Sequence, residues 1–208
     1  MPLPRFERLD EERRDAILTA AASEFSEHGF ERASYNGIIA SAGISKGAMY
    51  YYFADKDDLF RTVLREAITR WITSVGSPSI ATTAAEFWEE AERVYARSLR
   101  LMMDDPMTAA LCLSATRARQ RLEGHPALIE LNEAMTSWTR ALIGHGQSLG
   151  AIRRDLPPDL LLHVGLSMMD AGDRWLADRW DEIERDDVER IAKLMVKLFR
   201  RVGETADE

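Results

Sequence analysis

Apolar residues recur every three or four positions along most of this chain, which is the spacing of one face of an α-helix. No stretch alternates convincingly between apolar and polar residues in the way that a half-buried strand does. The pattern therefore predicts an all-α fold of about nine helices. We expect these helices to begin at Asp10, Ser34, Ser45, Asp55, Thr83, Asp105, Pro126, Pro157 and Asp186.

The chemistry of the expected helix ends supports these limits. Ser, Thr and Asp side chains accept hydrogen bonds from the free N–H groups of a first turn. Thr83, followed three residues later by Glu86, has the spacing of a capping box. Glycine tolerates the left-handed conformation that ends many helices. The glycines expected to end helices are Gly29, Gly43, Gly76, Gly150 and Gly203.

Helix length divides the chain into two parts. The second and third predicted helices are short, and the helices after Pro78 are long. We therefore place a domain boundary near residues 55–60, with no flexible linker. The two parts are residues 1–56, which hold both short helices, and residues 57–208.

Composition limits the class of protein. The chain has 208 residues, 46% of them hydrophobic, which is enough to bury a sizeable core. No apolar run has the length of a membrane span, and charges occupy the N-terminal region where a secretory signal would be apolar. Cys112 is the single cysteine, which excludes an intramolecular disulfide framework. We expect a cytoplasmic protein with no membrane partner and no cofactor.

The segment from Ser34 to Lys56 has the pattern of a helix-turn-helix, with two short capped helices on either side of Gly43. Its expected inward contacts are Ile38, Ile44, Met49 and Phe53. Its expected outward residues on the second of these helices are Ser45, Lys46, Gly47, Ala48, Tyr50 and Tyr51. Small residues allow the backbone to approach a DNA groove, and lysine and tyrosine side chains can reach bases and phosphates.

The charge of the chain has to be considered locally. A net charge of −8 argues against binding of nucleic acid through bulk positive charge. Residues 32–54, however, contain no Asp or Glu, so a small docking surface is compatible with phosphate. Residues 134–154 are also free of acid, so this feature alone is weak, and two short helices around a glycine occur in many helical bundles.

Residues 25–59 resemble the DNA-binding domain of TetR-family transcriptional regulators. The matching residues are Phe25, Gly29, Phe30, Ser34, Ile38, the run from Ala42 to Gly47, Met49, Tyr50, Phe53, Lys56 and Leu59. The resemblance covers about the first quarter of the chain by motif, and the remainder only by helix number and length. It implies a helix-turn-helix DNA-binding domain over residues 1–56 and a helical ligand-sensing and dimerisation domain over residues 57–208. It also implies a homodimer that binds double-stranded operator DNA and releases it when a small molecule binds.

The resemblance also implies roles for individual residues. Ser34 would cap its helix and touch a phosphate, Lys46 and Ala48 would meet base edges, and Tyr50 would contact a phosphate. Lys56 would open the fourth helix, where the positive end of the helix dipole favours a phosphate. Tyr35 and Asn36 are further candidates for DNA contacts, although they, like Ile39, depart from the residues usual in the family.

The remaining candidate chemistry is sparse. The four histidines have no metal-ligand spacing, and no group of residues has the pattern of a catalytic site. An enzyme in the helical second part is the alternative function, which a turnover screen would reveal. A helical adaptor that binds only proteins is another, and a gel shift with DNA would separate it from a regulator.

Aromatic residues and methionines gather on the faces of the later helices. Such faces are typical of an ordinary core, and they also suit an apolar ligand cavity, which the resemblance favours. The candidates for binding an apolar or amphipathic effector are Trp71, Trp88, Tyr95, Met102, Cys112, Met135 and Trp138. The fourth helix, from Lys56 to Trp71, would act as a lever, or alternatively as a plain structural strut.

The last two helices carry apolar stripes that can complete the chain's own core or pair with a second copy. Because a helix-turn-helix binds paired half-sites, we favour a two-fold dimer made by a four-helix bundle. The expected interface residues are Leu162, Leu166, Met169, Val188, Ile191, Met195 and Leu198.

Overall fold

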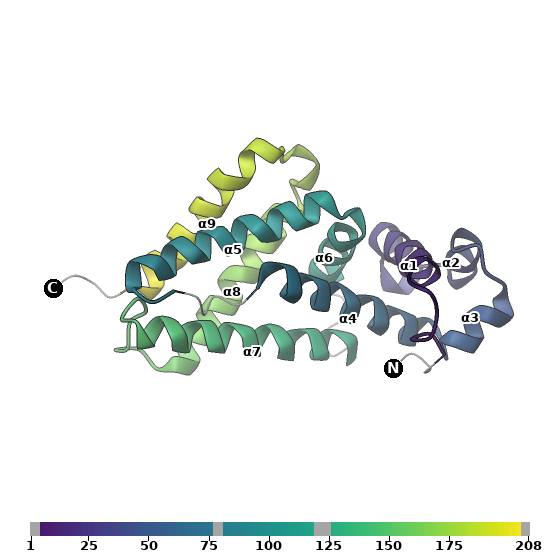
Figure 1. Cartoon of the computed structure of the whole chain (residues 1–208), viewed down its shortest axis with the longest axis horizontal. Helices are drawn as coiled ribbons and strands as arrows, with labels where there is room; N and C mark the ends of the chain where they lie inside the picture. Colours follow the sequence, from purple (N-terminus) through teal and green to yellow (C-terminus); the bar gives the residue numbers. More distant parts are fainter. Residues whose placement is uncertain (1–4, 77–80, 119–125, 205–208) are drawn as a thin grey trace. The chain divides into compact units, whose positions relative to one another are not determined.

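The computed structural model describes residues 5–76, 81–118 and 126–204, and it confirms the all-α prediction. The described residues form nine α-helices and two short 3₁₀ turns, Trp180–Glu182 and Arg185–Asp187 (Figure 1). The helices are α1 (Glu11–Arg32), α2 (Tyr35–Ser41), α3 (Lys46–Tyr52), α4 (Lys56–Val75), α5 (Ala84–Asp104), α6 (Pro106–Ala118), α7 (Pro126–Ser148), α8 (Pro158–Ala177) and α9 (Val188–Gly203).

Several helix ends follow the chemistry expected from the sequence. The Asp10 side chain accepts a hydrogen bond from the N–H of Arg13 at 2.9 Å. Gly29, with φ of +72°, interrupts α1 at the predicted position, so the last residues of α1 form a separate turn. The cap at Thr83 is present, but the Glu86 carboxylate accepts from the N–H of Thr82 rather than completing a box with Thr83.

The largest difference at a helix end is at the start of α9. The sequence predicts a start at Asp186, whereas the helix begins at Val188 after a 3₁₀ turn. The side chains of Glu184 and Asp187 cap that turn reciprocally. The acidic run therefore has the expected capping role, but it caps a tighter turn that precedes the helix.

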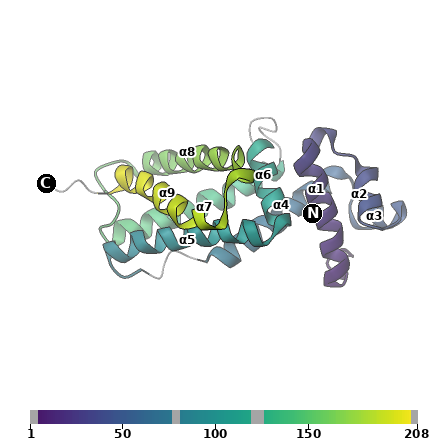
Figure 2. The same cartoon turned by 90° about the horizontal axis from the view of Figure 1, so that it is seen from above.

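The chain divides into two compact units, residues 1–70 with 105–131 and residues 71–104 with 132–208. The first unit contains α1–α3, all of α6 and most of α4. The second unit contains α5, α8, α9 and most of α7. Each of these helices is labelled in Figure 2. The functional boundary predicted at residue 56 does not coincide with this division, and it stays a prediction.

The core of the first unit forms where the apolar face of α1 packs on α2, α3 and α4. Phe25, Phe30 and Phe60 make an aromatic cluster, with the Phe60 ring centroid 4.9 Å from each of the other two. Helix α6 packs on α1, and the Thr19 hydroxyl lies 3.4 Å from the Met107 sulfur. This core holds the helix-turn-helix.

The second unit has two hydrophobic clusters built largely on α5. One of them gathers Phe87, Trp88 and Val196, together with Ile152 from the segment after α7. The other joins α5 to the inner face of α9. The residues of this second cluster are Ala96, Leu99, Leu176, Val188, Ile191, Ala192 and Met195.

Candidate functional site

Helices α2 and α3 form the predicted helix-turn-helix, and each begins at a serine cap. The Ser34 hydroxyl accepts from the N–H of Gly37 at 3.0 Å, and the Ser45 hydroxyl accepts from the N–H of Ala48 at 3.1 Å. Gly43, with φ of +66°, makes the turn between the helices, a conformation that L side chains rarely adopt. The local sequence therefore sets both helix starts and the turn between them.

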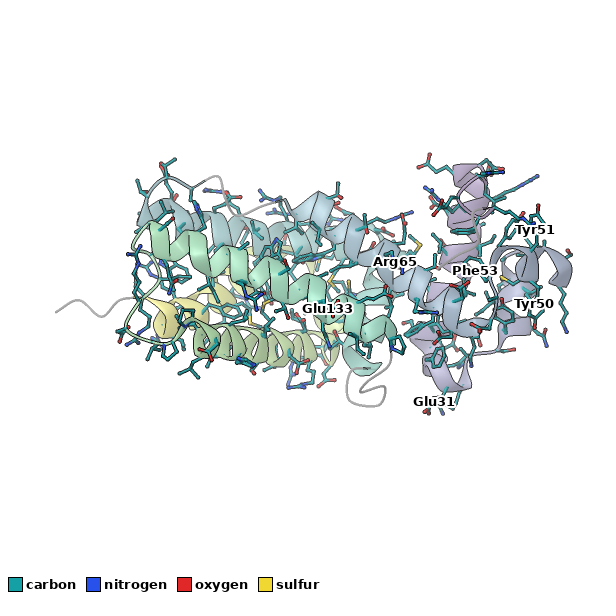
Figure 3. The ribbon with its side chains drawn as sticks, turned by 90° about the horizontal axis from the view of Figure 1, so that it is seen from below. Glu31, Tyr50, Tyr51, Phe53, Arg65 and Glu133 are labelled. Atoms are coloured by element: carbon teal, nitrogen blue, oxygen red, sulfur yellow. The ribbon has the colours of Figure 1, made fainter. Side chains whose placement is uncertain are left out.

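Buried side chains fix the orientation of α3. Ile38, Met49 and Phe53 are fully buried in the core of the first unit, and Ile44 packs against its edge. The Phe53 ring points back into the unit, whereas Tyr50 and Tyr51 lie along the outside of α3 (Figure 3). The inward set is the one expected from the sequence.

The outward face of α3 has the composition expected of a surface that approaches DNA. Ser45, Lys46 and Gly47 are exposed and Ala48 is half-buried. Tyr50 and Tyr51 are each 49% exposed, which is unusual for such large side chains. Because two large aromatic side chains are left half exposed on one helix, this face is the candidate DNA-binding surface.

The half-buried ring of Tyr35 packs against the ring of Tyr50. The two rings meet edge to face with centroids 5.5 Å apart. The Tyr35 hydroxyl is enclosed with no hydrogen-bond partner among the described residues. Burial, with smaller contributions from Tyr50, Asp55 and Asp58, raises the pKa of Tyr35 to about 12. The Tyr35 ring thus packs on Tyr50, and the neighbouring Asn36 is exposed. The DNA contacts predicted for Tyr35 and Asn36 stay predictions.

Lys56 opens α4 as expected, and its side chain forms hydrogen bonds within the first unit. Its Nζ donates to the carbonyl oxygens of Glu31 and Ala33, both at 3.1 Å, and lies 5.0 Å from the centroid of the Phe30 ring. The ammonium thus ties the end of α1 to the start of α4. The phosphate contact expected at this helix start rests on the backbone N–H groups and the helix dipole, and it stays a prediction.

The carboxylates of Glu24 and Asp58 form hydrogen bonds to backbone N–H groups in the same region. The Glu24 carboxylate accepts from the N–H of Ser34 at 2.7 Å, so this N–H is already occupied. Asp58 is buried, and its carboxylate accepts from the N–H of Ala54 at 3.2 Å, while its own N–H donates to Asp55 at 2.8 Å. Asp55 and Asp58 are three residues apart, which is the spacing of a helix cap, so the sequence alone predicts this arrangement.

Arg70 is a second feature that the sequence argument did not identify. Its guanidinium donates to the carboxylates of Asp15 at 2.7 Å and Glu66 at 3.1 Å, and it lies 3.9 Å from Asp105. Asp105 in turn caps α6 by accepting from the N–H of Met107 at 3.0 Å. Arg70 therefore joins α1, α4 and the start of α6.

The candidate effector residues fall into separate places. The Trp71 indole N–H donates to the Ser98 hydroxyl at 2.6 Å, and its ring lies 5.6 Å from that of Trp138 in an edge-to-face arrangement. Trp88 packs on Phe87 in the core of the second unit. Trp71 and Trp138 are the candidates that the structure brings into direct contact.

The other effector candidates are less closely grouped. Tyr95 lies at the edge of both clusters of the second unit, and burial, with the nearby Asp173 carboxylate, raises the pKa of its hydroxyl. Met102 and Met135 are half-buried on α5 and α7. Cys112 is half-buried on α6 in the first unit. Their role in ligand binding stays a prediction.

The predicted interface residues divide into inner and outer sets. Val188, Ile191 and Met195 are buried against α5 within the same chain, so they cannot form the surface of a contact between copies without rearrangement. Leu162 is buried as well, and Leu166 and Met169 are half-buried. Leu198 is exposed.

The apolar stripe left open on α9 shares Leu198 with the predicted one. It consists of Leu194, Leu198 and Val202, which are 38–45% exposed and spaced four residues apart, so they lie on one face. On α8, Leu160 and Trp175 are the large apolar side chains that remain exposed.

Within the described ranges, no group of His, Cys, Asp or Glu side chains has the geometry of a metal site. None of the helices described is long and apolar enough to cross a bilayer.

Comparison with known proteins places this geometry among bacterial regulators. Residues 17–63 match the family model described as "Bacterial regulatory proteins, tetR family". The HTH-type transcriptional repressor AcnR of Corynebacterium efficiens is 27% identical over 148 residues, which are 71% of this chain and 73% of that protein.

Solved structures share the fold over nearly the whole chain. The fatty acid degradation regulator FadR from Bacillus halodurans has a TM-score of 0.74 at 19% identity, covering 93% of this chain and 97% of that one. FadR from Bacillus subtilis, solved in complex with stearoyl-CoA, has a TM-score of 0.70 at 18% identity, covering 89% and 96%. These two likenesses concern the fold.

Proposed function

We propose that this chain is a DNA-binding transcriptional regulator of the TetR family, a repressor released from its operator by an apolar or amphipathic small molecule. TetR-family regulators bind operator DNA and act as dimers. The observation that carries the proposal is the outward face of α3, where Lys46, Tyr50 and Tyr51 are exposed, while Met49 of the same helix is fully buried in the core. The relatives are regulators and not enzymes, so the enzymatic alternative is not favoured.

The proposed DNA contacts follow from the two kinds of residue on α3. Lys46 and the small residues Gly47 and Ala48 would approach base edges in the major groove, as the recognition helix of a helix-turn-helix does. Tyr50, held edge-on by Tyr35, would donate its hydroxyl to a phosphate. Base contacts specify the sequence, whereas phosphate contacts fix the register.

Substitution of Lys46 and Tyr50 should separate these two roles. Lys46→Ala is expected to weaken operator binding by about 1–3 kcal/mol and to relax the sequence preference at one position of each half-site. Tyr50→Phe should weaken binding to all sequences more evenly. The measurement is a gel shift with a DNA duplex selected by the purified chain from a random pool, and with point variants of that duplex.

Both side chains are exposed on α3, so circular dichroism should give unchanged folding for both variants. Wild-type affinity in both variants would remove the assignment of α3 as the recognition helix.

We place the effector near the Trp71–Trp138 pair. These two rings offer an apolar edge-to-face surface, and the Trp138 indole N–H is enclosed without a hydrogen-bond partner in the described structure. A ligand with an apolar chain and a hydrogen-bond acceptor would suit such a surface. The stearoyl-CoA bound by the Bacillus subtilis protein has that chemistry, which supports an acyl-CoA as the first compound to test.

Helix α4 provides a physical route from this region to the DNA-binding helices. It runs without interruption from Lys56, which is tied to the end of α1, to Val75. Its last turn is attached to α5, because Arg97 donates to the Val75 carbonyl at 3.0 Å and to the buried Glu90 carboxylate at 2.8 Å. A ligand that displaces Trp71 from Ser98 would therefore act directly on α4.

An effector of this kind should couple to operator affinity by about 1–3 kcal/mol, or roughly 5- to 150-fold. Binding of stearoyl-CoA and of shorter acyl-CoA compounds is first measured by titration, with tryptophan fluorescence as the signal. Gel shifts are then run at a saturating concentration of each compound that binds. By reciprocity, the selected operator duplex should weaken binding of the ligand by the same factor. If a saturating ligand leaves operator affinity within twofold, α4 is a structural strut and not a lever.

We place the dimer contact on α8 and the outer face of α9. The open stripe of Leu194, Leu198 and Val202 supports this, because an exposed apolar row on a helix is typical of a surface that another chain covers. A second copy related by a two-fold axis would bring the same stripe against itself and close a four-helix bundle.

A further inference from the structure

The turn before α1 lies against the recognition helix. Arg5 to Arg8 form a turn closed by a hydrogen bond from the N–H of Leu9 to the carbonyl of Phe6 at 3.1 Å. The Phe6 side chain is only 3% exposed, and its ring centroid lies 4.7 Å from that of Phe53 and 6.3 Å from that of Tyr52. Leu9 packs against the same core. The turn is therefore fastened at both ends to the helix-turn-helix core.

This attachment determines where Arg5 can reach. Its guanidinium carbon lies 4.2 Å from the centroid of the Tyr51 ring, on the exposed side of α3. Tyr51 is itself held edge-on by Tyr52, with ring centroids 5.6 Å apart. A guanidinium over an aromatic face gains cation–π attraction and keeps its N–H donors at the ring edge. Arg5 is thus held beside the candidate DNA-binding surface.

Within the described ranges, the charge of Arg5 is not neutralised by an ion pair. Arg5 is exposed, and among the residues that the structure describes no carboxylate pairs with it. By contrast, Arg13 pairs with Asp10, Arg61 with Asp57 and Arg65 with Glu130. A fixed and unpaired guanidinium next to an acid-free helix-turn-helix, in a chain of net charge −8, is a placement that suits phosphate.

We infer that Arg5, held over the Tyr51 ring by the buried Phe6, is an additional phosphate-contacting residue of the DNA interface. The turn before α1 is then a part of the DNA-binding surface, and it adds one positive charge for each protomer. This inference rests on the proposed function, because it assigns a further contact to the same surface.

The test is the salt dependence of DNA binding, measured by fluorescence anisotropy with the duplex selected by the wild-type chain. Each phosphate contact contributes about 0.9 to the slope of log affinity against log salt concentration. Arg5→Ala should therefore reduce the magnitude of that slope by about 1 for each bound protomer. As the salt concentration rises fourfold, the affinity ratio of wild type to variant should shrink by about threefold for each protomer. Arg5→Lys, which keeps the charge but not the planar fork, should recover most of the slope.

The matched control is Arg65→Ala. Arg65 also lies in the first unit and is partly exposed, but it is on α4, away from Tyr50 and Tyr51 (Figure 3). Its loss removes the same charge and should leave the slope at the wild-type value. A slope for Arg5→Ala equal to that of Arg65→Ala overturns the inference.

Combination with Tyr51→Ala tests the positioning by the ring. If Arg5 acts from its place over Tyr51, the effect of Arg5→Ala should be smaller in the Tyr51→Ala background than in wild type. Equal effects in the two backgrounds would contradict that placement. If the wild-type chain selects no duplex from the random pool, the proposed function itself fails, which is a different outcome from a failed Arg5→Ala comparison.

Discussion

The double variant Leu194→Glu/Leu198→Glu is expected to be monomeric and to lose at least about 100-fold in operator affinity. Two DNA-binding domains joined in a dimer bind two half-sites with a high effective concentration for the second, which adds about 10²- to 10⁴-fold to the affinity of one domain alone. Two carboxylates placed in an apolar contact between identical helices would face their own copies across a two-fold axis, and they would lose their hydration there.

The exposure of these two residues allows the effect on the dimer to be separated from an effect on folding. Leu194 and Leu198 are 44% and 45% exposed, and neither belongs to the buried clusters that α9 forms with α5. The substitutions should therefore leave the fold of the single chain intact. Light scattering at micromolar concentration measures the mass, which should fall to 23.6 kDa, and a gel shift with the selected duplex measures the affinity.

A matched control adds the same two charges elsewhere. Ser137 and Ala141 are exposed on α7 and have the same four-residue spacing. Ser137→Glu/Ala141→Glu should remain dimeric and should bind the duplex with wild-type affinity. A double α9 variant that remains dimeric would show that another face joins the two copies.

The sequence was sufficient for most of the fold because local chemistry sets helix ends. Serine caps at Ser34 and Ser45, and glycines with positive φ at Gly29 and Gly43, act within three or four residues of their own position. Interactions of this range are visible in a single sequence. The same locality explains why the inward set of the helix-turn-helix was predicted residue by residue.

Packing between segments that are far apart in the chain determines which apolar residues are buried, and helical periodicity alone does not predict it. Helical periodicity shows that α9 has an apolar side, but it does not show that α5 of the same chain covers Val188, Ile191 and Met195. The remaining exposed stripe, which includes Leu194 and Leu198, becomes evident only when that partner is known. The packing of α6 on α1 is another contact between segments far apart in the chain.

The directions of long side chains in the candidate site depend on such packing too. Lys56 finds carbonyl oxygens at the end of α1, 23 and 25 residues earlier in the chain. Arg5 lies over Tyr51 because Phe6 enters a core that α1, α3 and α4 build together. A motif identifies the type of residue at each position, whereas the direction in which a long, charged side chain points depends on neighbours that the motif does not specify.

Phe60→Ala is expected to lower the free energy of unfolding of the first unit by about 3–5 kcal/mol, the cost of deleting a buried aromatic ring and leaving a cavity. Phe60 has no exposed surface, and its ring centroid lies 4.9 Å from those of Phe25 and Phe30. Phe30 in turn receives the Lys56 ammonium. Removal of the Phe60 ring would thus weaken the packing of α1 on α4 and the contact of Lys56 with the end of α1. Operator binding should weaken as a result.

Two spectroscopic signals can follow this loss separately. Every tryptophan of the chain, Trp71, Trp88, Trp138, Trp175 and Trp180, lies in the second unit, so tryptophan emission reports on that unit while far-ultraviolet circular dichroism reports on all helices. Urea titration of Phe60→Ala should shift the circular dichroism transition to lower denaturant more than the tryptophan transition. Phe60→Leu, which removes fewer atoms, should show a smaller shift in the same direction. A transition of Phe60→Ala within about 0.5 kcal/mol of wild type, a difference typical of surface substitutions, would mean that this aromatic cluster does not hold the DNA-binding helices in place.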